Sequence, residues 1–248
     1  MLSAARLSLA KQAVRNAKTI TVLTGAGISA ESGVPTFGDA LTGLWAKYDP
    51  EELASEAAFR RNPQLVWEWY KVRRETVERA LPNPGHRALA QLKRHRSKTT
   101  LITQNVDGLH EKGGWPDPLE LHGNIHRVRC IESCSPRRFP AAAVANPRCP
   151  SCGSWLRPDV VWFGEMLPAE AFTKAARSSQ ECDVFLCVGT SALVQPAASL
   201  PLEAIAAGAA LIEVNLSDTP LSDLAAFVLT GSAATILPEL LGAADLTS

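Results

Sequence analysis

The chain has 248 residues, of which 46% are hydrophobic, and its 25 acidic residues balance its 25 basic ones. This length suits one sizeable core with a small second module. A net charge of zero gives no electrostatic reason to expect binding to nucleic acid or to an anionic membrane. No segment approaches the roughly 20 apolar residues that span a bilayer, and the N-terminus lacks the order of a secretory signal. We therefore expect a cytoplasmic, globular protein.

The predicted elements begin with a helix in residues 1–16, where apolar side chains recur at helical spacing. Runs of apolar and β-branched residues then predict strands at 19–24, 99–103, 184–188, 211–214 and 227–229. Near-continuous apolar character is typical of parallel strands that are buried on both faces. Because helix-length segments separate most of these runs, the pattern predicts a doubly wound α/β sheet whose ligand lies beyond the carboxyl ends of the strands.

Two stretches interrupt the alternation and have the character of insertions that form a smaller domain. The first, residues 35–84, holds a loop and a helix. We expect this helix to begin after Asn62 as its cap, with Pro63 in the first turn, and to end before Pro82. The second, about residues 127–156, holds four cysteines. The larger domain is then expected to comprise residues 1–34, 85–126 and 157–248.

The four cysteines form two short pairs, Cys130-x3-Cys134 and Cys149-x2-Cys152. Two such pairs supply the ligands of a closed, tetrahedral structural zinc site. In a cytosolic protein, metal ligation or buried thiols are favoured over disulfides, although two disulfides or four unconnected thiols remain the alternative. Four bound thiolates leave no open position for water, so we expect the zinc to stabilise a small ribbon and not to take part in chemistry.

The segment Gly25-Ala26-Gly27-Ile28-Ser29-Ala30 follows the first predicted strand. Its GxGxxA spacing is that of a nucleotide-binding turn, although this spacing alone is weak evidence. A dehydrogenase would place an acidic residue about 20 positions later, at the end of a second strand. Residues 45–52 do not read as a strand, so hydride transfer is disfavoured.

Seven motifs follow one another in order along the chain: GAGISAESGVPTF from Gly25, QNVDGLH from Gln104, Leu121-His122-Gly123, the four cysteines, RPDVVWFGE from Arg157, Gly189-Thr190-Ser191 and Val214-Asn215. In this order, and over almost the full chain, they resemble the sirtuin family of NAD-dependent protein deacylases. The resemblance implies a Rossmann-type NAD-binding domain and a zinc-containing small domain. It also implies that NAD and an acyl-lysine peptide meet in the cleft between the two domains.

The resemblance assigns roles to individual residues. His122 would be the base for ribose hydroxyls, which suits an imidazole because it titrates near neutral pH. Asn105 would position the ribose and a water, Asp107 would receive the nicotinamide amide, and the amides at 25–27 would meet phosphate. The full set expected to bind NAD is Gly25, Ala26, Gly27, Ala30, Phe37, Trp45, Gln104, Asn105, Val106, Asp107, Gly189, Thr190, Ser191, Asn215, Leu216 and Ala233.

The resemblance also implies the reaction. The acyl carbonyl oxygen would attack ribose C1′ as nicotinamide leaves, and the products would be free lysine, nicotinamide and O-acyl-ADP-ribose. The substrate peptide would add as a strand. Its contacts would be Val160, Val161, Phe163 and Gly164. The expected partners are acyl-lysine proteins or peptides, and we expect a monomer that binds neither nucleic acid nor membrane.

On the helix after Asn62, Val66, Tyr70, Arg73 and Val77 fall on one stripe. A guanidinium among apolar neighbours needs an anionic partner, and a phenol one turn away offers a second donor. The Tyr-x-x-Arg pair resembles the one that marks the desuccinylase and demalonylase branch of sirtuins, where it reads the distal carboxylate of the acyl chain. The alternative is an arginine that reaches the surface or pairs with a nearby glutamate such as Glu68 or Glu75. Deacetylation remains open as a second activity.

The chain departs from the family pattern at Gly38, where sirtuins usually have an arginine, and Asp39 follows it. The missing arginine would approach NAD, so its loss removes a strong donor and loosens the loop. Weaker NAD binding, compensation by Lys47 or Arg60, and altered activity are the three consequences left open.

Two other functions compete with the deacylase. A protein ADP-ribosyltransferase could use the same NAD site, but the Tyr70 and Arg73 pair argues against it. A non-catalytic NAD-binding interaction module would explain Gly38, but His122, Asn105 and Asp107 argue against that.

Overall fold

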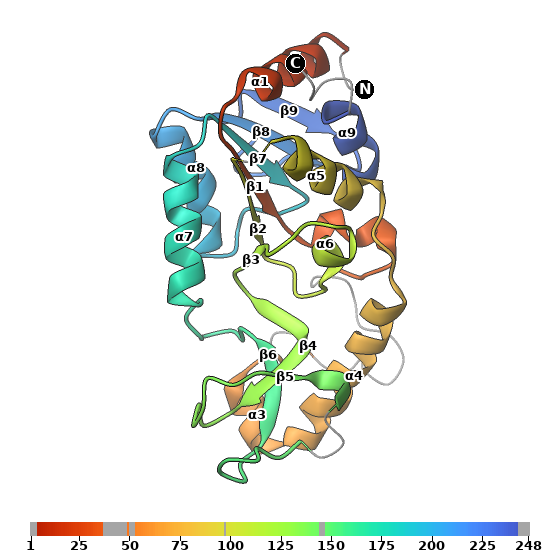
Figure 1. Ribbon diagram of the computed structural model, residues 1–248, viewed down its shortest axis with the longest axis vertical. Helices are drawn as coiled ribbons and strands as arrows, with labels where there is room; N and C mark the ends of the chain where they lie inside the picture. The colour runs from red at the N-terminus through yellow and green to blue at the C-terminus, as the bar shows by residue number, and fades with distance from the viewer. Residues whose placement is uncertain (1–3, 37–48, 50–52, 97, 144–146, 243–248) are drawn as a thin grey trace.

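The computed structural model describes residues 4–36, 49, 53–96, 98–143 and 147–242. Residues 45–52, for which no strand is expected, fall outside this range except for Asp49. The chain forms a large lobe around a six-stranded sheet and a small lobe around a three-stranded sheet (Figure 1). Among the described residues, no helix combines the length and the apolar character that a membrane span requires.

The large sheet is entirely parallel, with the strand order β3-β2-β1-β7-β8-β9. Its strands are β1 (Ile20–Thr24), β2 (Thr99–Thr103), β3 (Leu119–Glu120), β7 (Val184–Val188), β8 (Ala210–Asn215) and β9 (Phe227–Thr230). All five predicted strands are present, and their ends differ from the prediction by one residue at most. The sequence pattern does not predict β3, because two residues are too few to carry a periodic signal.

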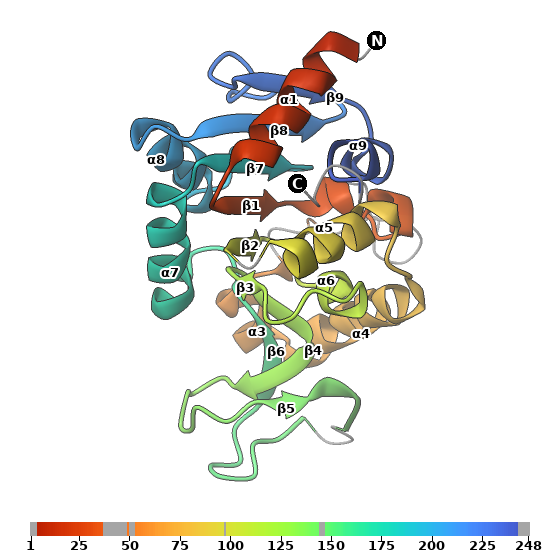
Figure 2. The ribbon, with the colours of Figure 1, turned by 45° about the horizontal axis from the view of Figure 1, so that its top comes forward.

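Helices cover both faces of the large sheet, so the apolar strands are buried between two helical layers (Figure 2). One layer consists of α1 (Ala4–Asn16), α5 (Pro84–His95) and α9 (Ala233–Leu240). The other consists of α7 (Ala169–Gln180) and α8 (Leu200–Ala206). Further short helices among the described residues are α6 (Leu109–Lys112), η1 (Ala26–Ile28), η2 (Ala30–Ser32), η4 (Ala141–Ala143) and η5 (Ala197–Ser199). This arrangement confirms the doubly wound α/β fold.

The small lobe combines α3 (Glu56–Arg61) and α4 (Pro63–Arg79) with an antiparallel sheet. The sheet has the order β5-β4-β6, formed by β4 (Gly123–Cys130), β5 (Phe139–Pro140) and β6 (Leu156–Val160). The prediction for α4 is confirmed: Asn62 caps the helix by accepting from the Leu65 amide at 3.1 Å, and Pro63 is its first residue. The small sheet begins before residue 127 and ends beyond residue 156, because β4 pairs with β6 from Gly123 onward.

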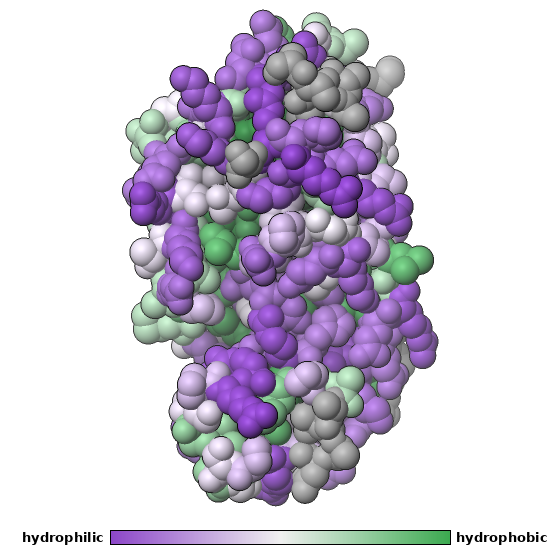
Figure 3. All heavy atoms as spheres, viewed as in Figure 1, coloured by the Kyte–Doolittle hydropathy of each residue, from purple (hydrophilic) through white to green (hydrophobic). Residues whose placement is uncertain are grey.

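The surface differs from these buried cores. On the face seen in Figure 3, hydrophilic side chains predominate and apolar side chains appear in scattered groups. This distribution agrees with apolar side chains that gather in the buried cores.

Candidate active site

A cleft of about 1480 Å³ is lined by the carboxyl ends of the central strands and by the small lobe. Of the residues expected to bind NAD, the acyl group or the peptide, Phe37 and Trp45 lie outside the described residues. Among the described ones, Ala233 alone does not line the cleft. The structure brings together there Gly25, Ala26, Gly27, Ala30, Tyr70, Arg73, Gln104, Asn105, Val106, Asp107, His122, Val160, Val161, Phe163, Gly164, Gly189, Thr190, Ser191, Asn215 and Leu216.

Ala233 has a packing position instead. It is the first residue of α9 and is 6% exposed. A Cβ atom added to Gly85 at the start of α5 would lie 3.0 Å from the Ala233 carbonyl oxygen, so the two helices meet there backbone to backbone. In this structure Ala233 therefore supports the position of α9 and does not reach the cleft.

The floor of the cleft is formed where the loops after β1 and β7 touch. A Cβ atom on Gly27 would lie 2.8 Å from the Gly189 Cα, and one on Gly189 would lie 2.4 Å from the Ile28 amide nitrogen. Gly189 also has a φ of +59°, in the left-handed region. Glycine is required here for the close approach of two main chains, in addition to any approach of a ligand.

The same contact changes which amides are available to a phosphate. The Gly25 amide donates to the Val188 carbonyl at 3.0 Å, and the Gly27 amide donates to the Gly189 carbonyl at 2.8 Å. Of the three amides expected on phosphate, these two are thus already engaged within the chain. Of these three amides, the one of Ala26 is therefore the one we still expect to donate to a phosphate of NAD.

A buried hydrogen-bond network surrounds Ser29. Its Oγ donates to Asp107 Oδ2 at 2.7 Å and accepts from Asn105 Nδ2 at 3.2 Å, and His86 Nε2 lies 3.4 Å away. Ser29 thereby fixes the two side chains expected beside the nicotinamide riboside. Sequence patterns do not identify Ser29 or His86 as site residues: Ser29 stands inside the glycine motif, whereas His86 lies on another helix and joins the site through tertiary contact alone.

Asp107 is 4% exposed, and its Oδ1 accepts the Leu109 amide at 2.9 Å. Burial raises the pKa of Asp107, while the bonds from Leu109 and Ser29 oppose that rise. Each carboxylate oxygen offers a second lone pair beyond the one already used. Asp107 is therefore held in one orientation and keeps the capacity to accept from a ligand amide.

His122 lies directly before β4, in the short connection from β3 of the large lobe to β4 of the small lobe. Its Nδ1 is 2.9 Å from the Gln104 carbonyl oxygen. A carbonyl can only accept, so the neutral ring carries its hydrogen on Nδ1 and keeps a lone pair on Nε2. Burial lowers the pKa of His122, with the Gln104 hydrogen bond opposing that shift. The ring is neutral at pH 7 and can act as a base through Nε2.

Gln104, Thr190 and Asn215, which follow or end β2, β7 and β8, are joined by hydrogen bonds. Gln104 Nε2 donates to Thr190 Oγ1 at 2.9 Å, and Asn215 Nδ2 donates to the Thr190 carbonyl at 3.0 Å. Ser191 and Leu216 are exposed beside them. The ends of β2, β7 and β8 thus form one connected polar wall.

Tyr70 and Arg73 belong to α4, where a spacing of three places them on one side of the helix. The Arg73 guanidinium carbon lies 5.0 Å from the centroid of the Trp69 ring. Burial lowers the pKa of Arg73, with the Tyr70 phenol opposing that shift, but a guanidinium remains protonated in proteins. The structure therefore places a half-buried cation and a phenol in the cleft wall.

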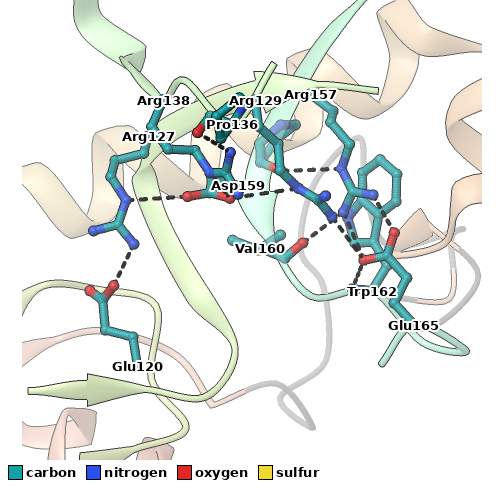
Figure 4. A network of polar contacts seen from close by, with 11 residues as sticks. Glu120, Arg127, Arg129, Pro136, Arg138, Arg157, Asp159, Val160, Trp162 and Glu165 are labelled. Atoms are coloured by element: carbon teal, nitrogen blue, oxygen red, sulfur yellow. Dashed lines mark hydrogen bonds and ion pairs between the residues drawn. The ribbon is translucent and has the colours of Figure 1, made fainter. Parts of the chain in front are cut away.

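A charged network joins the two lobes (Figure 4). Asp159 on β6 pairs with Arg127 at 3.3 Å, with Arg129 at 3.6 Å and with Arg138 at 2.9 Å. Arg127 also pairs with Glu120 of β3. Because Glu120 belongs to the large sheet and Asp159 to the small one, Arg127 bridges the lobes next to His122.

The four cysteines of the motif form one cluster. The sulfur pairs Cys134–Cys130 and Cys134–Cys149 are 3.5 Å apart, Cys130–Cys152 is 3.6 Å apart, and all four sulfurs lie within 4.8 Å of one another. Zinc–sulfur bonds of about 2.3 Å in a tetrahedron place sulfurs about 3.8 Å apart, whereas a disulfide needs about 2.05 Å. The cluster therefore fits one zinc ion and excludes disulfides. None of these cysteines lines the cleft, which agrees with a structural role.

Gly38 and Lys47 lie outside the described residues. Arg60, the other residue considered as compensation for the missing arginine, pairs with Glu56 at 2.7 Å and with Glu132 at 3.0 Å. It does not line the cleft. Arg60 therefore belongs to the surface of the small lobe, where two glutamates engage its guanidinium.

Comparisons with known proteins agree with this site. The sequence profile of the Sir2 family matches residues 25–196. The NAD-dependent protein deacylase of Methylococcus capsulatus is 47% identical over 239 residues, which cover 93% of this chain and 94% of that protein. The protein of the same name from Aquifex aeolicus is 51% identical over 210 residues, which cover 83% of this chain and 87% of that protein.

Solved structures are similar as well. A Sir2 homolog in complex with NAD has a TM-score of 0.89 and 46% identity, covering 94% of this chain and 92% of that one. A Sir2 complex with a p53 peptide and NAD+ has a TM-score of 0.81 and 29% identity, covering 92% of this chain and 94% of that one. With the fold, the cleft and the cysteine cluster in agreement, the chain belongs to the Sir2 family, the sirtuins.

Proposed function

We propose that this sirtuin is an NAD-dependent protein-lysine deacylase that favours acyl groups ending in a carboxylate, as in succinyl-lysine and malonyl-lysine. The observation that carries this proposal is that Tyr70 and Arg73 line the same cleft as His122, Asn105 and Asp107. Relatives that cover more than nine tenths of the chain are named NAD-dependent protein deacylases, which supports the general reaction.

The residues at the strand ends fit NAD. A main-chain amide at Ala26, the exposed Ser191 hydroxyl and the side chain of Asn215 offer hydrogen bonds along one wall of the cleft. When bound, NAD supplies a ribose carbon that loses nicotinamide and accepts the acyl oxygen. His122 takes a proton from a ribose hydroxyl through Nε2, and Asp107 holds the nicotinamide amide through its carboxylate.

The part of the cleft lined by Tyr70 and Arg73, called here the acyl end, supports selection for an acyl group that carries a carboxylate. Arg73 is a half-buried cation against an aromatic ring, where the lowered dielectric strengthens its attraction for a carboxylate. A neutral acetyl group leaves this attraction unused and brings no charge to offset the burial of the guanidinium. We therefore expect succinyl-lysine to be turned over more efficiently than acetyl-lysine.

The two lobes bind different groups in this proposal. The large lobe holds NAD, and the small lobe holds the acyl chain and the zinc. The residues of the Val160–Gly164 segment that line the cleft bind the peptide backbone. Six cysteines without a disulfide support a reducing compartment such as the cytoplasm. We expect a monomer that acts on acyl-lysine proteins and does not bind nucleic acid. Light scattering checks the oligomeric state, and filter binding checks the absence of nucleic-acid binding.

The test compares NAD-dependent nicotinamide release from matched succinyl-lysine and acetyl-lysine peptides. Arg73→Met should lower kcat/KM for the succinyl peptide by about 10- to 100-fold, the worth of a hydrogen bond to a charged group, and change the acetyl value little. Lys71→Met removes an exposed charge from the same helix and serves as the matched control. Equal losses on both peptides would reject carboxylate recognition.

If neither peptide is turned over, the same assay is repeated with the Gly38→Arg variant. Activity that appears only after this change identifies a deacylase whose cofactor loop is disabled in this chain. No turnover by either the wild-type chain or the variant, with NAD binding retained in calorimetry, identifies an NAD-binding interaction module. Transfer of labelled ADP-ribose to protein without peptide deacylation identifies an ADP-ribosyltransferase.

A further inference from the structure

Trp162 makes a direct hydrogen bond to the phenol of the acyl end. Its Nε1 hydrogen is donated to Tyr70 Oη at 2.9 Å, and the two side chains are 2% and 4% exposed. They come from different elements, Tyr70 from α4 and Trp162 from the segment after β6. The bond therefore joins residues 92 positions apart inside the core of the small lobe.

The direction of this bond constrains the hydrogen of the phenol. An indole nitrogen only donates, so Tyr70 Oη must be the acceptor. The hydroxyl hydrogen cannot then point at Trp162 and must point elsewhere. Among the described residues, no acceptor takes the Tyr70 hydroxyl hydrogen, while the side chain lines the cleft beside Arg73.

We propose that Trp162 is a positioning residue that aims the hydroxyl hydrogen of Tyr70 into the acyl end of the cleft, where it is donated to the carboxylate held by Arg73. This inference rests on the proposed function and adds to it a residue that acts through another. Tyr70 makes the contact with the acyl group, and Trp162 determines which way the contact is directed.

Trp162 is itself rigidly held (Figure 4). The Arg157 guanidinium carbon lies 3.3 Å from the centroid of the Trp162 ring, and Arg157 pairs with Glu165. Glu165 Oε2 accepts the Trp162 main-chain amide at 2.8 Å, and Arg157 also donates to the Val160 carbonyl at 2.6 Å. The ring plane and the backbone of Trp162 are thus fixed from two sides before any ligand arrives.

The ionisation of this group suits a donor. Burial raises the pKa of Tyr70 to about 12, while Arg73 and the bond from Trp162 oppose that rise. Burial raises the pKa of Glu165, but the bonds from Arg157 and the Trp162 amide outweigh it, so the carboxylate stays charged. At neutral pH the phenol keeps its hydrogen and the ion pair that supports Trp162 stays intact.

The test is a double-mutant cycle on acyl selectivity, the ratio of kcat/KM for succinyl-lysine and acetyl-lysine peptides. Trp162→Phe keeps an aromatic ring and removes the donor, whereas Tyr70→Phe removes the hydroxyl. Each should lower the ratio by roughly tenfold, mainly through the KM of the succinyl peptide, and the double variant should lower it no further.

Trp67→Phe is the matched control, because its indole also donates a hydrogen bond in the small lobe, to the Leu156 carbonyl at 2.8 Å, yet it does not line the cleft. It should reduce stability and leave the ratio unchanged. An unchanged ratio in Trp162→Phe, or losses that add in the double variant, overturns the positioning role while the wild-type preference for the acid still stands. A wild-type enzyme without that preference overturns the proposed function first, and the inference with it.

Discussion

The large and small lobes hold their parts of the cleft by different physical means. In the large lobe, buried apolar strands lie between two helical layers, and the floor of the cleft is made by glycines whose main chains touch. In the small lobe, a short sheet is held by a cluster of four thiols and by ion pairs such as Arg157 with Glu165. Added atoms should therefore damage the large lobe, whereas removal of charges or of the metal should damage the small lobe.

Zinc removal should have the largest effect and should act on the small lobe. Structural zinc contributes about 10–16 kcal/mol of apparent binding free energy, which is comparable to the whole stability of a domain. After chelation, hydrogen exchange should show loss of protection in β4 and β6 while β1 and β7 stay protected. Unchanged protection in β4 and β6, with zinc shown to be absent, would contradict this.

Two variants separate the cluster from the other thiols. Cys134→Ser should lose the bound zinc and reproduce the effect of chelation. Cys182→Ser, at a buried thiol of the large lobe that donates to the Ser179 carbonyl, should keep one zinc per chain.

His122 stands between the lobes, so its removal should stop the chemistry and spare both structures. His122→Ala should lower turnover by about 10²- to 10⁴-fold, the usual worth of a general base. NAD binding in calorimetry and the melting temperature should remain close to wild type. His95→Ala, at an exposed histidine at the end of α5, is the control and should keep full turnover. Turnover near the wild-type level in His122→Ala would remove it as the base.

Gly189→Ala tests the large lobe by adding a single atom. The new Cβ would lie 2.4 Å from the Ile28 nitrogen at a φ of +59°, so we expect a loss of about 3 kcal/mol in the free energy of unfolding, with weaker NAD binding. Gly33 has a φ of +79° but no atom within 4 Å of an added Cβ. Gly33→Ala should therefore cost only about 1 kcal/mol. Equal losses in urea unfolding would show that backbone strain, and not the touching of the two loops, is what requires glycine.

The two lobes also differ in how far the sequence predicts them. Continuous apolar runs predict the parallel strands, and the Asn62 cap with Pro63 predicts α4, because these signals are local. The small sheet is not predicted, because an irregularity between Asn124 and Val128 breaks the alternation of polar and apolar residues in β4, which pairs with a strand far along the chain. The metal cluster lies in that same lobe and is predicted nonetheless, since ligand spacing is a local property.

The site shows the same division. Motifs predict which residues line the cleft, but they do not predict how those residues are used. The Gly25 and Gly27 amides bind the β7 loop, and Ser29 joins Asp107 to Asn105. These contacts depend on which chain segments meet in space, and no local pattern records that.

Acid should weaken the large lobe through its buried imidazoles, with a smaller effect than the changes above. His86 and His110 are buried with their rings 5.0 Å apart. Burial lowers the pKa of His86 to about 4, and it lowers the pKa of His110 well below the usual value of about 6.5. Both rings are neutral in the folded chain at neutral pH. The unfolded chain takes up protons first as the pH falls.

Stability should therefore be complete above pH 6.5 and should decline as the pH falls toward 4. At pH 5 the contribution of His86 to this loss is about 2 kcal/mol. His86→Gln, which keeps polar atoms but cannot titrate, should flatten the dependence of urea unfolding on pH between 7 and 5. An equally steep dependence in this variant would place the acid sensitivity in another group, such as the buried imidazole of His110.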